Sequence, residues 1–386
     1  MTPMLCIKDM GYNLYILERF RLSYVLFFLI SVSLQMHSQG TAGFFDDRRF
    51  FFTYMNGSIS KQEILPIERF HSSLNYITYI DRNGNFKLIV DHKKYTIFPV
   101  PPDRLKVSNY LMAYIQGLQL GVFNGKQSKK VETFTKGDFK LGDSVLGFID
   151  NFGRLKVYVY DTIYQLMDFS DTSLYSVSDN LVAFHTRDNK FKVFYHNAIY
   201  DLENITPNNY KMGRNIIAYH DNIDNFMVFD RGEKTLLESY HIDQYEVSND
   251  FLTYLSNVEE WSVYHQGKKH TLLSTAPKSK LQKRNLLAYS DNANNFYLFT
   301  RGKAWQLENY TPIKYDIWDD LLVYEDMYRV LWGVYNGVKI QISKGVIQGQ
   351  WQLQNQCVVY WDLTPNTMTV WNKGNLYQYS EVDNRR

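Results

Sequence analysis

The sequence has 386 residues, of which 45% are hydrophobic, enough for one large domain or for two to three ordinary ones. Its 42 basic residues are balanced by 40 acidic ones, so it lacks the basic excess that nucleic-acid binding requires. Aromatic residues make up 16% of the chain, with 31 tyrosines and 25 phenylalanines, a composition that favours strands over helices.

The N-terminal segment is typical of a signal peptide. Arg19 and Arg21 precede a mostly apolar stretch over residues 22–34, and small and polar residues follow over 35–43. A basic start, an apolar centre and an exit of small residues are the three parts of an export signal. The apolar stretch is short for a bilayer span, so an uncleaved anchor is the alternative interpretation.

We expect cleavage near Ser38 or Gln39, at a site that resembles those of many exported proteins of Bacteroidota-type bacteria. Residues 1–39 would then be a signal peptide and residues 40–386 the mature chain, without a transmembrane span. Because the segment ahead of the apolar stretch is long, the true first residue of the protein could lie further along, for example at Met10. The sequence thus predicts export to the periplasm or to the outer surface.

The two cysteines predict no disulfide. Cys6 lies ahead of the apolar stretch and would be removed with the signal peptide, which leaves Cys357 alone. Cys357 lies in an apolar stretch over residues 356–360, so we interpret it as a buried structural thiol rather than a reactive one.

The rest of the chain is an internal repeat of about 35 residues. Each unit contains a marker aromatic residue, preceded by a small or β-branched residue and usually followed two places later by an aspartate. The markers are Phe44, Tyr79, Tyr114, Phe148, Phe184, Tyr219, Tyr254, Tyr289, Tyr324 and Tyr360. The aspartates are Asp46, Asp81, Asp150, Asp221, Asp291, Asp326 and Asp362. A period of this length is typical of solenoids, propellers and similar arrays.

Each unit has the pattern of four short strands. In the seventh unit these strands are expected at residues 245–250, 251–255, 260–265 and 269–273. Third strands carry apolar residues at successive positions, which indicates burial on both faces of the sheet. A sheet packed between two neighbouring sheets would have this property.

The turns support the same division. Asn336-Gly337 and Asn124-Gly125 lie between third and fourth strands, where a tight hairpin needs two residues with positive φ. The segment 81–85 lies between a second and a third strand, and its Asp, Asn and Gly residues favour a loop.

Four-stranded antiparallel units in radial repetition predict an all-β fold, a β-propeller of about ten blades. A β-solenoid is the alternative, although it suits the repeated hairpin turns poorly. The units close either one wide ring or, as the second possibility, two five-bladed rings. The C-terminal residues 380–384 have the pattern of a first strand and are expected to complete the first blade, which would remove an open edge.

The segments 285–292 and 295–302 resemble the repeats of TolB-type propellers, and in fold also WD40-like ones. The shared features are a small residue before an aromatic one, an acidic turn, and an aromatic strand that ends in a glycine hairpin. The resemblance covers about residues 41 to 384. These units are shorter than those of TolB and differ in number. The resemblance implies a propeller with a binding or scaffold role, by analogy of fold.

The repeated polar residues have structural explanations. The aspartates could form a ring of cation ligands, but calcium loops need a further carboxylate that is not in register, so we expect capped turns. His185 and His220 occupy equivalent positions in adjacent units and are the candidate metal ligands, without an identifiable third ligand. We therefore expect neither a metal nor another cofactor.

The seven tryptophans all lie in the C-terminal part of the chain. Three of them, Trp261, Trp332 and Trp371, fall on core positions of third strands. The other four, Trp305, Trp318, Trp351 and Trp361, fall near strand ends and are the candidate binding residues. Filling of gaps in an aromatic core is the competing explanation.

The sequence contains no nucleophile elbow, phosphate-binding loop or selected carboxylate pair. We therefore expect a non-enzymatic propeller of the cell envelope that binds a protein or a glycan. The alternatives are a carbohydrate-active enzyme or lectin on the same scaffold, and a purely structural component of an envelope assembly.

Overall fold

A computed structural model describes residues 40–133, 138–169, 174–363 and 367–380. The predicted signal peptide, residues 1–39, lies outside this described part. All of the regular secondary structure in the described ranges is β-strand, arranged in ten antiparallel sheets. Among the same residues there is no helix that is long and apolar enough to cross a membrane.

The sheets follow one another along the chain and are numbered here as blades 1 to 10. Blade 1 consists of β1 (Thr41–Phe45), β2 (Phe51–Met55) and β3 (Ser58–Glu63), and blade 2 of β4 (Arg69–Ser72), β5 (Tyr76–Ile80), β6 (Phe86–Val90) and β7 (Lys93–Phe98). Blade 3 consists of β8 (Arg104–Val107), β9 (Met112–Gln116), β10 (Gln119–Phe123) and β11 (Ser128–Thr133), and blade 4 of β12 (Phe139–Leu141), β13 (Val145–Ile149), β14 (Leu155–Val159) and β15 (Thr162–Met167). Blade 5 consists of β16 (Tyr175–Val177), β17 (Leu181–His185), β18 (Phe191–Tyr195) and β19 (Ala198–Glu203).

Blades 6 to 10 have the same order of strands. They consist of β20 (Tyr210–Met212), β21 (Ile216–His220), β22 (Phe226–Asp230) and β23 (Glu233–Glu238); β24 (Tyr245–Val247), β25 (Phe251–Leu255), β26 (Trp261–His265) and β27 (Lys268–Leu273); β28 (Ser279–Lys283), β29 (Leu286–Ser290), β30 (Phe296–Thr300) and β31 (Lys303–Glu308); β32 (Lys314–Trp318), β33 (Leu321–Glu325), β34 (Leu331–Tyr335) and β35 (Val338–Gln341); and β36 (Gln352–Gln354), β37 (Cys357–Trp361), β38 (Thr367–Asn372) and β39 (Asn375–Ser380).

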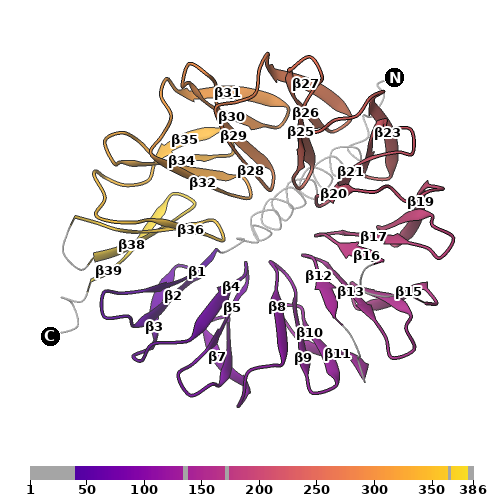
Figure 1. Ribbon diagram of the computed structural model, residues 1–386. Helices are drawn as coiled ribbons and strands as arrows, with labels where there is room; N and C mark the ends of the chain where they lie inside the picture. Colours follow the sequence, from indigo (N-terminus) through magenta and orange to yellow (C-terminus); the bar gives the residue numbers. More distant parts are fainter. Residues whose placement is uncertain (1–39, 134–137, 170–173, 364–366, 381–386) are drawn as a thin grey trace, which may run out of the picture. The chain divides into compact units, whose positions relative to one another are not determined.

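The ten blades form one ring, with the first strand of each blade innermost and the last strand outermost (Figure 1). This confirms the predicted propeller and excludes the alternative of two five-bladed rings. The second strand of blade 7 has the predicted bounds. The first strand, β24, ends three residues earlier than expected, because residues 248–250 make the turn to β25.

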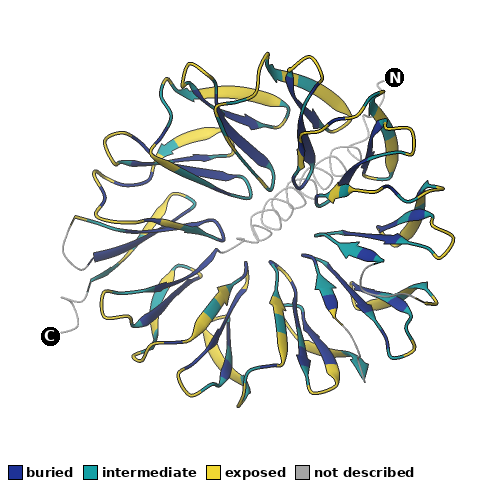
Figure 2. Cartoon of the chain, in the orientation of Figure 1, coloured by how far each residue is buried: buried dark blue, intermediate teal, exposed yellow. Residues whose placement is uncertain are grey.

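The hydrophobic core lies in the seams between blades. The buried residues concentrate on the second and third strands of blades 2 to 10, and on β1 and β2 of blade 1 (Figure 2). In the seam between blades 6 and 7, Ala218 and Phe226 pack against Leu252 and Tyr254. Ala218 is fully buried beside the marker Tyr219, so a small side chain is needed where the blades approach closely. Burial on both faces explains the uninterrupted apolar third strands.

Six of the seven recurring aspartates cap the turns between second and third strands, as predicted, and the turn after Asp362 lies partly outside the described residues. The Asp81 carboxylate accepts hydrogen bonds from the backbone N–H groups of Asn83 and Asn85, both at 2.9 Å. Burial alone would raise the pKa of Asp81, but hydrogen bonds from Lys87 and Asn85 outweigh it and lower the pKa to about 2. In the exceptional seventh unit, Ser256 takes the same role and accepts from the N–H of Glu260.

The turns between third and fourth strands need positive φ at two successive residues. Asn336 and Gly337 have φ values of 52° and 80°, which confirms the predicted tight hairpin there. The prediction for Asn124-Gly125 is wrong in part, because only Gly125 has a positive φ. The Asn124 side chain instead accepts hydrogen bonds from the backbone N–H groups of Lys126 and Gln127, and so closes a longer loop.

The ring closes where blade 1 meets blade 10. Ala42 and Phe44 of β1 share a buried core with Cys357 and Val359 of β37. The Gln354 side-chain amide bonds both backbone groups of Gly43, at 3.1 and 2.9 Å. Cys357 is fully buried in this closure seam, as expected of a structural thiol. The predicted extra strand at residues 380–384 falls almost wholly outside the described residues, and blade 1 has three described strands.

Candidate functional site

The turns between first and second strands all emerge at one end of the propeller, because strands alternate in direction within a blade. At this end, neighbouring turns are bonded to each other through the backbone. The N–H of Ser144 donates to the carbonyl of Asp179, that of Arg214 to Asn249, and that of Asn249 to Arg284, at 2.8 to 3.0 Å. These turns therefore form a bonded collar at this end, which we call the inner collar.

Close approach within the collar explains two glycines. A Cβ on Gly142 would lie 1.8 Å from the carbonyl oxygen of Ser178, and one on Gly213 would lie 1.6 Å from that of Ser248. Both distances are far below van der Waals contact with a backbone atom, which cannot move aside as a flexible side chain would. Only glycine fits where one turn rests on the next.

A ladder of side-chain hydrogen bonds runs along the same collar. The hydroxyl of Ser144 donates to Asn180 at 2.6 Å, the Asn180 amide to Asn215 at 2.9 Å, and the Asn215 amide to Asp250 at 2.5 Å. Four successive blades are linked in this way. The side chains behind the collar are thus held by their neighbours and are positioned before any ligand arrives.

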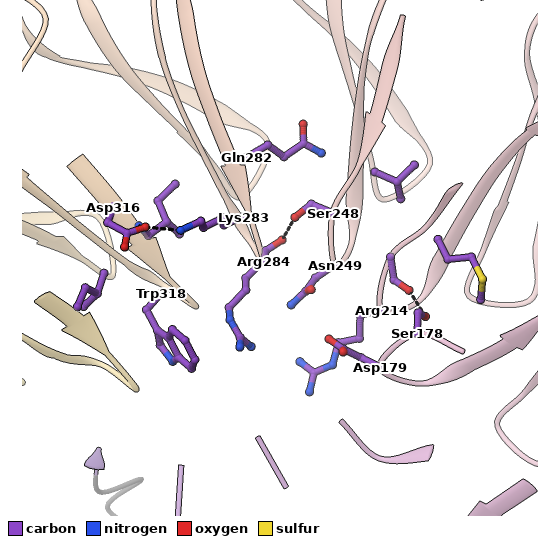
Figure 3. A pocket seen from close by; sticks show the side chains of 15 residues that line it. Ser178, Asp179, Arg214, Ser248, Asn249, Gln282, Lys283, Arg284, Asp316 and Trp318 are labelled. Carbon is purple, nitrogen blue, oxygen red and sulfur yellow. Dashed lines mark hydrogen bonds and ion pairs between the residues drawn. The ribbon is translucent and has the colours of Figure 1, made fainter. Parts of the chain in front are cut away.

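Inside the collar lies a cavity of about 560 Å³, which the first strands and turns of blades 5 to 10 line. Figure 3 shows Arg214, Asn249 and Arg284 directed toward the same open space, with Trp318 beside Arg284. Three cationic side chains and two carboxylates line it. Lys283 and Asp316 pair with each other at 2.5 Å, so that two arginines and Asp179 carry the remaining charge.

Arg284 reaches across the ring. Its Nη2 donates to Oδ1 of Asn109 at 3.2 Å, and its Nη1 lies 3.9 Å from Oδ2 of Asp143. Arg284 belongs to blade 8, whereas Asn109 and Asp143 belong to blades 3 and 4, on the other side of the axis. The guanidinium also stacks on the ring of Trp318, 4.1 Å from its centroid, an arrangement that favours a cation.

Burial shifts the titration of the central carboxylates. It raises the pKa of Asp179 to about 6, together with the nearby carboxylate of Asp143, while Arg214 and Arg284 act in the opposite direction. Burial also raises the pKa of Asp319, with Asp320 adding to the effect. Both groups keep a proton at a higher pH than an exposed aspartate would.

The side-chain amide nitrogen of Asn249 is a hydrogen-bond donor without an acceptor among the described residues. Asn249 is only 9% exposed, and its Nδ2 finds no hydrogen-bond partner among the described residues. A buried amide without a partner is costly, so a group that satisfies it on binding gains more than an ordinary hydrogen bond. The cavity thus presents two guanidinium groups, and the unsatisfied amide nitrogen of Asn249 lies buried just behind its surface. This arrangement can bind an acceptor.

Comparison with known proteins identifies the family. The family model described as "10-bladed beta propeller domain" matches residues 35–377. The chain belongs to this ten-bladed β-propeller family. No curated protein matches the sequence significantly.

The propeller is also similar to solved structures, at low identity. The computationally designed protein Ika8 is 12% identical over 81% of this chain and 96% of its own, with a TM-score of 0.30. Prp20p from Saccharomyces cerevisiae is 9% identical over 54% and 75%, with a TM-score of 0.31. PorZ, a surface component of the type-IX secretion system of Porphyromonas gingivalis, is 10% identical over 88% and 59%, with a TM-score of 0.27. Similarity at this level says nothing about the function of the propeller.

The four tryptophans predicted for binding lie in four different places. Trp318 lines the central cavity. Trp305 is 55% exposed on the outermost strand β31, and Trp361 lines a separate cavity of about 450 Å³ with Asp47 and Leu363. Trp351 is buried in the core between blades 9 and 10 and carries the ammonium group of Lys314 over its ring. The structure thus brings only Trp318 to the cavity, and the binding role of the four stays a prediction.

His185 and His220 have separate surroundings. His185 contacts Phe191 and Tyr210, whereas His220 stacks on His241 with ring centroids 4.1 Å apart. The Nε2 of His220 accepts a hydrogen bond from the N–H of Ile242 and is therefore unprotonated. The described residues contain no group of three or more His, Cys, Asp or Glu side chains that could hold a metal ion.

The cavity residues Arg214, Asn249 and Arg284 were missed by the sequence analysis. They occupy one position of the repeat, five residues before the marker aromatic. The residues at this position in blades 3 to 10 are Asn109, Asp143, Asp179, Arg214, Asn249, Arg284, Asp319 and Asn355. An unbroken series of polar residues next to an apolar strand was the available signal, and it indicates a position that faces the axis.

Proposed function

We propose that this propeller is an exported, non-enzymatic module that binds a segment of a partner protein in its central cavity. The observation that carries the proposal is the cavity of about 560 Å³ inside the inner collar, with polar groups from several blades directed into it. A concave site with a few convergent polar groups is the usual form of a ligand site.

The rigidity of the collar supports a binding role. Backbone and side-chain hydrogen bonds fix the turns that carry Asp179, Arg214, Asn249 and Arg284. A site that is ordered before binding loses little conformational entropy when its ligand arrives. The ring supplies this order, and no single blade contains the site.

A protein segment suits the cavity better than a glycan does. Sugars stack on open aromatic faces, but one face of Trp318 is covered by the guanidinium of Arg284. The other groups directed inward are mainly hydrogen-bond donors, which match the carbonyl and carboxylate oxygens of a polypeptide.

Photocrosslinking tests this function directly. A photoreactive phenylalanine analogue would replace Lys283 in the cavity or, as the matched control, exposed Trp305 on the outer rim, in the full-length chain in its native cells. We expect a discrete protein adduct from position 283 that is missing from position 305. Equal adducts from both positions, a glycan adduct, or no adduct from position 283 would overturn the proposal.

Export is tested separately by the N-terminal sequence of the native protein. We expect the native protein to begin near residue 39 or 40 and to occur in a fraction that is released without cell lysis. An intact N-terminus in the cytoplasmic fraction would contradict export while leaving the cavity experiment interpretable.

A further inference from the structure

The donors in the central cavity come from three successive blades and are directed toward the same open space. Arg214 and Arg284 come from blades 6 and 8, and Asn249 lies on the turn of blade 7 between them, where its amide nitrogen has no partner among the described residues (Figure 3). Guanidinium groups are planar forks that match carboxylate oxygens, and an amide N–H can add a third bond.

The charge of the lining limits what kind of anion fits. With Lys283 and Asp316 neutralising each other, the charged groups that remain on the lining are two guanidinium groups and the carboxylate of Asp179, which lies beside Arg214 (Figure 3). Asp143 and Asp319 stand close behind, so a dianion such as phosphate would meet strong repulsion. A group with one negative charge would meet less of this repulsion, and the residues that line the cavity carry an excess of one cationic group.

We propose that the cavity recognises a carboxylate group of the partner segment, bound between Arg214 and Arg284, with the Asn249 amide as a third donor once its side chain turns toward the ligand. This proposal rests on the proposed binding function and names the chemistry of its ligand. The carboxylate is supplied either by an acidic side chain or by the C-terminus of a polypeptide. Arg284 would exchange its long contact with Asp143 for the incoming carboxylate and keep its stacking on Trp318.

The proposal is tested with the purified full-length chain and an array of short peptides. Three sets are compared: capped peptides with one Asp or Glu, the same peptides with Asn or Gln, and the neutral peptides with a free C-terminal carboxylate. We expect binding to the first or the third set, at least tenfold tighter than to the second. The set that binds identifies the source of the carboxylate.

Variants of the donors connect binding to this cavity. Arg284→Gln removes the charge and the long reach to Asn109, but it keeps the backbone carbonyl that accepts from Ser248. We expect it to weaken peptide binding at least tenfold, and Arg284→Lys to restore part of the loss. Arg301→Gln, which removes a cation from an exposed turn outside the cavity, should change binding less than twofold.

The outcomes separate the two proposals. Equal binding of acid and amide peptides, no binding of any set, or full binding by a folded Arg284→Gln variant would overturn carboxylate recognition. Competition by inorganic phosphate but not by acetate would also overturn it. If the adduct from position 283 persists in the Arg284→Gln background, the binding function stands and only the carboxylate is refuted.

Discussion

Single residues in this propeller are fixed by backbone geometry at the turns and by burial at the axis. The aspartates that recur along the chain fold back on their own turns, whereas Arg214 and Arg284 face the cavity from a repeat position whose residue type varies between blades. Positions that keep one residue type therefore serve the fold. The variable position at the axis is the candidate for function.

Gly337 offers a test of backbone strain without a steric complication. Its φ is 80°, and a Cβ there would have no atom within 4 Å. We expect Gly337→Ala to lower the free energy of unfolding by about 1–2 kcal/mol, because an L-residue is strained in the left-handed region. Gly345 also has open space but no positive φ, so Gly345→Ala should stay within about 0.5 kcal/mol of the wild type. Chemical denaturation measures both, and equal effects would refute the explanation.

Asp179 predicts a pH dependence of stability. Its pKa is raised to about 6 in the fold, so the folded state holds the proton more tightly than the unfolded chain does, and stability falls as pH rises from about 4 to 6. Asp179→Asn cannot ionise and should be more stable than the wild type above pH 6. The difference should vanish below pH 4.

Thermal unfolding across this pH range checks the effect of Asp179→Asn. The exposed Asp243, outside the cavity, provides the control Asp243→Asn, for which we expect no such pH-dependent gain. A variant that is less stable than the wild type above pH 6 would show that the Asp179 charge is stabilised by the arginines rather than destabilised by burial.

At the scale of the blade, the marker aromatics have a second role where they are tyrosines. In four seams the tyrosine hydroxyl donates to a glutamate at the end of the preceding blade, and a fourth-strand lysine reaches the same carboxylate. The pairs are Tyr79–Glu63, Tyr219–Glu203, Tyr254–Glu238 and Tyr324–Glu308, at 2.6 to 2.9 Å. The lysines are Lys94, Lys234, Lys269 and Lys339. These polar clamps join neighbouring blades in addition to the apolar packing of the seams and the hydrogen bonds of the inner collar.

Removal of one clamp tests its contribution. Tyr219→Phe deletes the hydroxyl that donates to Glu203 at 2.9 Å and leaves the packing of the ring in place. We expect a loss of about 1–2 kcal/mol, since the half-buried carboxylate loses one donor and keeps Lys234. Tyr160→Phe, on a side chain that is 77% exposed, should change stability by less than about 0.5 kcal/mol. A neutral Tyr219→Phe would mean that water replaces the hydroxyl at no cost.

For the whole molecule, stability depends on the seam between the first and the last blade. Cys357 is fully buried there, and burial raises the pKa of its thiol, so it should react slowly while the ring is closed. Phe44, in the same seam, and Phe184, between blades 4 and 5, are equivalent markers. Each substitution to alanine should cost about 3–5 kcal/mol.

The two variants differ in where they open the ring. In a Cys6→Ser background, we expect Phe44→Ala to accelerate thiol labelling of Cys357 well beyond the effect of Phe184→Ala under native conditions. Equal acceleration would show that the ring unfolds as one unit, and no acceleration by Phe44→Ala would show that the closure seam does not open locally.

Much of this fold could be predicted from the sequence because its determinants are local. The 35-residue spacing, the alternation of strands and the turn chemistry of Asp81 or Asn336-Gly337 act within a few residues, and each repeat provides an independent observation of them. Asn124-Gly125 shows the limit, because the same residue pair closes a longer loop when its side chain bonds the following N–H groups. The four tryptophans could not be assigned to one site, since their positions near strand ends do not say which faces are covered.

The repeat unit, its four strands, its capped turns and the apolar seams follow from the sequence, since each depends on neighbours along the chain or in the next repeat. Closure of ten units into one ring does not, because it depends on the small rotation between blades, which side-chain packing sets and which accumulates over the whole chain. The central cavity likewise exists only in the closed ring. Gln354 meets Gly43 and Arg284 meets Asn109 only because the ring closes, and contacts between residues 311 and 175 positions apart have no counterpart in the repeat.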